Sequence, residues 1–143
     1  MKKIVSVIIL LAIAVFCVGT NAAAETPLKF ALLPDIGIPQ DNNLVGLELG
    51  FADTMNDVTG LQLCWIYNGS RGKVTGAQIG LVNTCDSLTG IQWGFYNKAQ
   101  SVTGFQIGVI NQTSRMNGIQ IGLLNFISTG SPLPFMVFIN GNF

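Results

Sequence analysis

One eight-residue phrase recurs along the middle of the chain and constrains the fold more than any other feature. The phrase is Gly-x-Gln-x-Gly-x-x-Asn, and its four copies read GAQIGLVN, GIQWGFYN, GFQIGVIN and GIQIGLLN. Each copy begins fourteen residues after the last, at Gly76, Gly90, Gly104 and Gly118. Two looser copies precede them, LVGLELGFAD from Leu44 and VTGLQLCWIY from Val58. A fixed period this short indicates a repeated strand.

Each repeat alternates with a period of two residues, as a strand requires. One face carries three large apolar side chains, such as Ile91, Trp93 and Phe95, whereas the other carries Gly, Gln and Gly between apolar residues. A helix is excluded because two glycines in each unit would cost about 1 kcal/mol each relative to Ala, and because the apolar spacing is not 3.6 residues. From Val58 onward every charged residue lies in a short link between copies. The sequence therefore predicts an all-β chain.

The repeats predict a small antiparallel, up-and-down β-barrel in which each fourteen-residue unit is one strand. The polar face is a palindrome about Gln, so antiparallel neighbours could set Gln opposite Gln. The links TCDS, KAQS and QTSR show no inward apolar residue that would make a second strand in each unit. The segment at Leu28, the six repeats and the segment from Leu133 to Phe143 make about eight strands. That number is typical of small membrane barrels.

A parallel β-solenoid is the alternative architecture. In a solenoid each unit is one coil, stacked parallel on the previous coil, and identical positions form ladders of Gln and of Asn. The end of the chain favours the barrel, because Phe135, Val137, Ile139, Gly141 and Phe143 alternate and finish on an aromatic residue. This pattern resembles the terminal strand by which bacterial outer-membrane barrels are recognised for insertion.

The N-terminus has the features of an export signal. Met1-Lys2-Lys3 is basic, Ile4 to Val18 is apolar and uncharged, and Ala22-Ala23-Ala24 offers a small-x-small cleavage site. This order is typical of a secretory signal peptide. The sequence therefore predicts a signal peptide over residues 1–24, a single repeat-built β domain over residues 25–143, and an exported protein of the outer membrane or cell surface.

The residue types after the signal peptide argue against several classes of function. Five basic residues stand against seven acidic ones, a net of about −2 without a basic cluster, so no nucleic acid partner is expected. The chain has no His, which is the commonest general base and transition-metal ligand. No nucleophile–base pair, metal cluster or phosphate loop is recognisable. We therefore expect no enzyme activity, no catalytic, cofactor-binding or metal residue, no cofactor, and free thiols at Cys64 and Cys85.

The polar residues of the repeats are predicted to have structural roles. The Gln row should satisfy itself as a hydrogen-bond ladder, because an amide both donates and accepts, and the Asn row should cap strands and support turns. Glu48 takes the Gln position of the first copy, where it is either a polar ligand group or a carboxylate bonded to a neighbour such as Gln62. The ladder candidates are Glu48, Gln62, Gln78, Gln92, Gln106, Gln120, Asn83, Asn97, Asn111 and Asn125.

The repeats resemble a group of bacterial surface-repeat proteins built from tandem Gly-x-Gln-x-Gly-x-x-Asn units. The match covers Leu44 to Asn125, and the ending Pro132-Leu133-Pro134-Phe135 is similar to the close of such chains. The first copy departs from the pattern with Glu48 for Gln and Asp53 for Asn, and the second has Cys64 for Gly and Tyr67 for Asn. The resemblance implies an exported, envelope-associated protein and brings no established activity.

Two functions follow from this pattern as predictions. The first is a structural outer-membrane β-barrel without catalysis, whose large apolar face meets the lipid bilayer and whose Gly and Gln face fills a narrow interior. The alternative is a secreted or surface-displayed β-solenoid that acts as a binding or adhesion module. Whether a protein or a glycan would be its ligand stays open.

Overall fold

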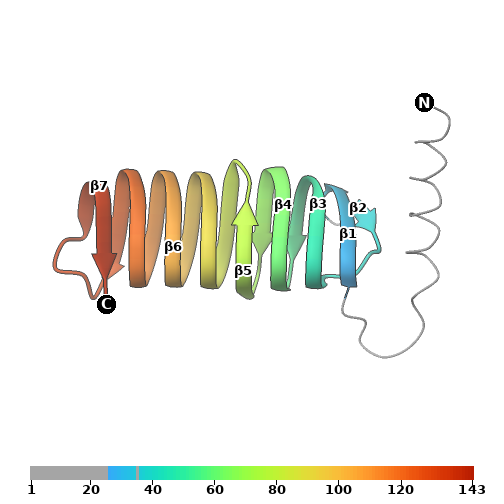
Figure 1. The fold of residues 1–143 in the computed structure, drawn as a ribbon, viewed down its shortest axis with the longest axis horizontal. Helices are drawn as coiled ribbons and strands as arrows, with labels where there is room; N and C mark the ends of the chain where they lie inside the picture. The colour runs from blue at the N-terminus through green and yellow to red at the C-terminus, as the bar shows by residue number, and fades with distance from the viewer. Residues whose placement is uncertain (1–25, 35) are drawn as a thin grey trace.

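The structure is a β-solenoid, a stack of flattened coils along one axis (Figure 1). It is a computed structural model that describes residues 26–34 and 36–143. The predicted signal peptide, residues 1–24, lies outside the described residues. The all-β prediction is confirmed. The antiparallel barrel is wrong, because consecutive coils stack in parallel, as the solenoid alternative predicted.

Seven strands form one sheet that winds around the solenoid axis. They are β1 (Thr26–Leu33), β2 (Ile36–Ile38), β3 (Asn43–Met55), β4 (Asp57–Ser70), β5 (Lys73–Ile79), β6 (Val82–Thr129) and β7 (Phe135–Asn142). The pairs β1–β3, β3–β4, β4–β5 and β5–β6 are parallel. Strand β6 has 48 residues because its pairing continues around the corners of several successive coils.

The register places each repeat directly beside the same positions of the previous repeat. Gly76 is paired with Gly90 and Gln78 with Gln92, an offset of one fourteen-residue unit. The links supply the second side of each coil. Their inward residues, such as Cys85 and Ala99, are buried although they are small or only weakly apolar. This is why the links did not look like strands, and why one repeat is a whole coil instead of one barrel strand.

The interior holds one continuous apolar cluster that runs through the coils. Its members are Leu44, Met55, Val58, Val74, Cys85, Leu88, Ala99, Val102, Met116 and Ile127. The Gln and Asn rows are also fully buried. As predicted from the alternation, the Gly and Gln face points inward and the face with large apolar side chains points outward. The outward face is exposed at the surface of the solenoid.

The first glycine of each repeat is needed for its backbone conformation. Gly90 has a φ of 139°, which L-residues rarely adopt. A Cβ at this position would also collide with the carbonyl oxygen of Gly76 in the coil before. The recurrent glycine therefore allows the coils to approach closely.

Both ends of the described stack carry an antiparallel strand. Strand β2, which was not expected, pairs with β1, and strand β7 pairs with the last coil of β6. Strand β7 lies within the predicted terminal segment Leu133 to Phe143. Across this pair, Asn140 lies opposite Gln120. Residues 26–34 and 36–143 include no helix long and apolar enough to cross a membrane.

Candidate functional site

Three rows of outward apolar side chains run along the solenoid, and together they form what we call the apolar face. The first row is Leu47, Leu61, Ala77, Ile91, Phe105 and Ile119; the second is Leu49, Leu63, Ile79, Trp93, Ile107 and Ile121; the third is Phe51, Trp65, Leu81, Phe95, Val109 and Leu123. Trp65 is 73% exposed, Trp93 59% and Phe95 55%. The predicted large apolar face is therefore on the outside, where none of the residues that the structure describes covers it.

The apolar face is larger than the apolar patches of ordinary monomers. Its most exposed members are Phe51, Trp65, Leu81, Ile91, Trp93, Phe95, Phe105, Ile121 and Leu123. The aromatic side chains among them alone leave roughly 600 Å² in water, because each carries about 150–250 Å². The aliphatic members raise the total to roughly 900 Å². The largest patch on a typical soluble monomer is about 300–600 Å², so this face has the size of an interaction surface.

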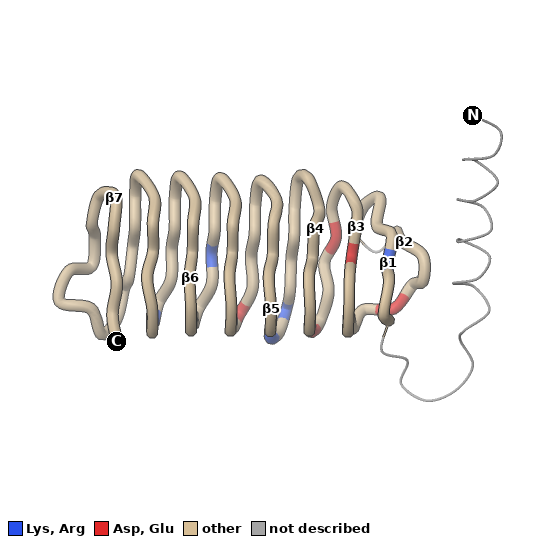
Figure 2. The backbone as a smooth tube through the Cα atoms, in the orientation of Figure 1, with Lys and Arg blue, Asp and Glu red and all other residues tan. Residues whose placement is uncertain are grey.

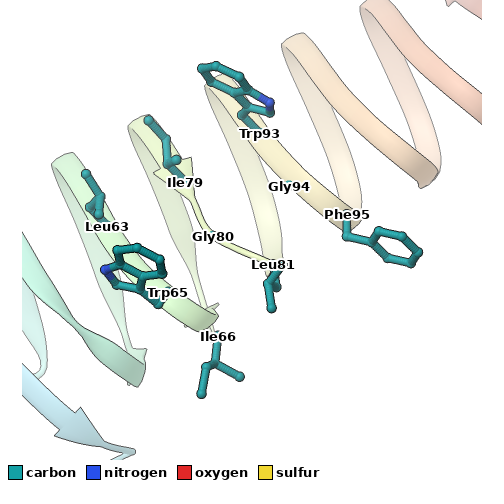
Figure 3. Close-up of a pocket in the computed structure, with 9 residues that line it drawn as sticks. All are labelled: Leu63, Trp65, Ile66, Ile79, Gly80, Leu81, Trp93, Gly94 and Phe95. Carbon is teal, nitrogen blue, oxygen red and sulfur yellow. The ribbon is translucent and has the colours of Figure 1, made fainter.

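A shallow groove runs along the apolar face between its second and third rows (Figure 3). One stretch of about 590 Å³ has Gly80 and Gly94 on its floor, with Trp93 and Phe95 on one coil and Leu81 on the coil before. A further stretch of about 540 Å³ continues past Ile107, Gly108, Val109, Ile121, Gly122 and Leu123 to Phe138 and Ile139 of β7. The glycines are required because a Cβ there would point inward. At Gly94 it would collide with the Gly80 carbonyl and the Asn83 amide.

An extra residue in β4 makes one end of this groove prominent. The β3–β4 register pairs Gly50 with Cys64 but Ala52 with Tyr67, so one additional residue is accommodated between them. Trp65 and Ile66 lie there, and both are more than half exposed. The irregularity therefore raises an aromatic side chain beside the groove.

The predicted ladder residues lie in two buried rows of hydrogen-bonded amides. In the Gln row, Gln78 Nε2 donates to Gln62 Oε1 at 2.8 Å, and Gln92, Gln106 and Gln120 each donate to the preceding Gln at 2.8 Å. In the Asn row the direction is reversed. Asn83, Asn97 and Asn111 each donate to the following Asn at 2.8 Å, ending at Asn125. Every member is fully buried.

The Asn side chains also bind the backbone near the corners of the coils. Asn83 Nδ2 donates to the carbonyl oxygen of Trp93 at 3.0 Å, in addition to its bond to Asn97. Sequence reasoning missed Asn68, which donates to Asn83 at 2.8 Å and begins the hydrogen-bonded Asn row. In the repeat phrase the Asn stands seven residues after the first Gly, and this count from Gly60 assigns the Asn position to Tyr67 instead. The sixteen-residue spacing from Gly60 to Gly76 was the available signal for an inserted residue.

The first described coils hold a buried cluster of charged residues. Lys29 from β1 forms an ion pair with Asp53 from β3, and both side chains are at most 2% exposed. Lys29 Nζ also donates to the carbonyl oxygen of Asp41 at 3.0 Å. Glu48 is the register partner of Lys29 on one side and of Gln62 on the other. Among the described residues no hydrogen bond joins Glu48 to Gln62, contrary to our expectation.

The carboxyl groups of this cluster have shifted pKa values. Burial, reinforced by neighbouring Asp53, raises the pKa of Glu48 to about 8. Burial alone would also raise the pKa of Asp53, but hydrogen bonds from Glu48, Lys29 and the Thr54 backbone outweigh it and lower that pKa. Near neutral pH, Glu48 is therefore mainly protonated and Asp53 is ionised. The cluster is sealed from solvent, so it can close the end of the ladders but offers no open binding site.

The two described cysteines are free thiols within the coils, as expected. Cys64 Sγ donates to Glu48 Oε1 at 3.6 Å, and burial raises the pKa of the Cys64 thiol. Burial, together with Asp86, raises the pKa of Cys85 to about 12. Within the part of the chain that the structure describes, no group of three His, Cys, Asp or Glu side chains is placed to hold a metal ion.

The exposed charges lie away from the apolar face. Arg71, Lys73, Asp86, Lys98 and Arg115 are all exposed, and most charged residues follow one edge of the solenoid (Figure 2). The apolar face has no charged member among its three rows.

Comparison with models of protein families, with curated protein sequences and with solved structures finds no match for this chain.

Proposed function

We propose that the chain is an exported β-solenoid that acts as a binding module and that the apolar face is its binding surface. The observation that carries this proposal is the exposure of Trp65, Trp93 and Phe95 within a continuous apolar area of roughly 900 Å². Keeping such a face in water is unfavourable by about 25 cal/mol for each Å². A partner that covers it recovers this free energy.

Other parts of the described structure support the choice of this face. The Gln row, the Asn row and the charged cluster are sealed inside the coils. These rows satisfy most of their polar atoms within the chain, so they serve as structure. The module is thus proposed to work without catalysis.

Export is proposed from the sequence. Residues 1–24 have the order of a secretory signal peptide, and the repeats resemble those of envelope-associated proteins. Fractionation of cells that express the full chain tests this point. We expect the chain in the envelope or the medium, and recovery from the cytosol with residues 1–24 uncleaved would contradict it.

A lipid bilayer is a second candidate partner. The two exposed tryptophans of the apolar face favour it, because Trp is enriched where proteins meet membrane interfaces. The face has no Lys or Arg within its rows to attract anionic lipid, so a bilayer would bind through apolar contact alone.

A matched pair of variants tests the binding surface. Leu81→Lys introduces a charge beside the groove at a side chain that is 57% exposed, and the long Lys stem can keep its ammonium group in water without unfolding the coil. Gln100→Lys adds the same charge outside the face, next to Asp86. The purified chain should be retained on a phenyl-substituted resin. Retention should fall severalfold for Leu81→Lys and stay unchanged for Gln100→Lys. Equal retention of both variants would overturn the proposal.

A further inference from the structure

We infer that the partner of the apolar face is a second copy of this chain, bound face to face in a symmetric dimer. This inference rests on the proposed function, because it assumes that the apolar face is the binding surface. It adds the identity of the partner, which makes the module homophilic.

The area of the apolar face matches what a stable dimer needs. A standard protein–protein interface buries about 800 Å² on each partner, and the exposed apolar side chains of this face offer roughly 900 Å². A small molecule is a poorer fit, because ligand sites enclose most of the ligand surface. The groove instead lies open along the face, beside Trp93 and Phe95 (Figure 3).

The spacing of the coils makes a second copy a matched partner. Adjacent coils are separated by the strand spacing of about 4.7–4.9 Å, so the three apolar rows have this pitch along the whole face. A second copy has the same pitch, and its third row can follow the glycine-floored groove coil by coil. In an isologous pair each copy contributes both a groove and a third row to the contact. A two-fold axis that runs along the solenoid, between groove and third row, places the third row of each copy over the groove of the other.

The electrostatics of the face permit contact between identical surfaces. Like charges placed opposite each other across an interface cost several kcal/mol, and a self-association surface must avoid them. None of the apolar face residues is charged. The exposed charges Lys73, Asp86 and Arg115 lie in the links, off this face. Two copies can therefore approach without bringing like charges together.

The native tryptophans report directly on this contact. The chain has two tryptophans, and both Trp65 and Trp93 lie on the apolar face. Sedimentation velocity and tryptophan emission are measured on the purified full chain over a thousandfold range of concentration. We expect a monomer–dimer equilibrium in which the emission shifts to shorter wavelength and acrylamide quenching decreases severalfold as the dimer forms.

The same variants sharpen the test. Leu81→Lys should raise the dimer dissociation constant at least about tenfold, equivalent to 1.4 kcal/mol, whereas Gln100→Lys should leave it unchanged. Circular dichroism checks that both variants remain folded. If Leu81→Lys does not fold, the concentration series of the unsubstituted chain still tests the dimer.

The outcomes separate this inference from the proposed function. A monomer at every concentration that is still retained on phenyl resin overturns the dimer and leaves the binding face in place. A chain that stays monomeric and is also not retained on phenyl resin overturns both the dimer and the proposed binding function. A shift in tryptophan emission that appears only when phosphatidylcholine vesicles are added makes a bilayer the partner and overturns the second copy. Association that Leu81→Lys leaves unchanged also overturns the inference.

Discussion

The first coil and the inner coils use different chemistry at equivalent positions. In the inner coils the buried positions are held by neutral amides, such as Gln92 and Asn97, each hydrogen-bonded to the same residue type in a neighbouring coil. In the first copy the corresponding positions hold Glu48 and Asp53, and Lys29 supplies the opposite charge. The coils stack in parallel in both regions, but the interactions that stabilise the buried positions differ.

The difference follows from what each group can donate and accept. An amide donates with its nitrogen and accepts with its oxygen, so a row of amides can continue through any number of coils. A carboxylate only accepts, which ends such a row unless a proton or a cation is added. The first coil provides both, a proton on Glu48 and an ion pair between Lys29 and Asp53. Among the described residues, buried charge is thus confined to the end of the ladders.

The largest expected effect comes from removing the cation of the first coil. Lys29→Met keeps most of the side-chain volume but leaves Asp53 ionised and buried without its partner. Breaking a buried ion pair in this way costs about 3–5 kcal/mol. Urea unfolding should show this loss, while Lys98→Met, at an exposed position, should change stability by less than about 0.5 kcal/mol. Equal effects of the two substitutions would mean that the first coil does not depend on its ion pair.

The pH dependence of stability tests the proton on Glu48. Its folded pKa of about 8 lies above the ordinary value of 4.5, so its contribution is complete below pH 4.5 and is lost as the pH rises toward 8. At about 1.4 kcal/mol per pKa unit the whole shift corresponds to roughly 5 kcal/mol, of which roughly 3 kcal/mol is lost by pH 7. The contribution of Asp53 to stability depends on pH with the opposite sign. Its lowered pKa contributes stability above about pH 4 that is lost in stronger acid.

Glu48→Gln gives the first coil the chemistry of the inner ones. The amide cannot titrate, so the decline in unfolding free energy between pH 4.5 and pH 8 should disappear, whereas the loss in strong acid caused by Asp53 should remain. Urea unfolding at a series of pH values measures both. An unchanged decline in the Glu48→Gln variant would show that another group is responsible.

A smaller effect distinguishes the middle of the Gln row from its end. Gln92 is bonded to Gln78 and Gln106, so Gln92→Met leaves a buried acceptor and a buried donor without ladder partners and should cost about 2 kcal/mol. At the end of the row, nothing among the described residues bonds Gln120 Oε1. Gln120→Met should therefore cost about half as much. Equal losses in chemical unfolding would contradict a directional ladder.

The sequence predicted the composition of each face better than the direction of the strands. Alternation placed Gln92 inward and Trp93 outward because side chains alternate in any strand, whatever its neighbours. Whether neighbouring strands run parallel or antiparallel depended on the links between the repeats. Cys85 and Ala99 each fill an inward position of a narrow coil, where a small side chain is enough, and a pattern read for large apolar residues overlooks them.

The end structures were harder to predict than the repeats. Ile36–Ile38 is a three-residue strand close to Pro34 and Pro39, too short for its alternation to be seen. The ion pair between Lys29 and Asp53 joins residues 24 positions apart, and only the stacking of β1 on β3 brings them together. The departure of the first copy from the repeat, at Glu48 and Asp53, was visible in the sequence. The ion-pair partner of Asp53 was not visible in the sequence, because Lys29 lies outside every copy of the repeat.

The parallel stacking of fourteen-residue coils is tested most directly by disulfide cross-linking. Thr75 and Thr89 are exposed register partners on adjacent coils, and the strand spacing of about 4.8 Å lies within the Cα separation that a disulfide accepts. With both residues replaced by cysteine, peptide mapping after mild oxidation should find a 75–89 bond. An antiparallel pairing that sets Gln78 opposite Gln92 would instead bring Thr75 beside Phe95. A cross-link in the Thr75→Cys, Phe95→Cys variant, with none between positions 75 and 89, would contradict the solenoid.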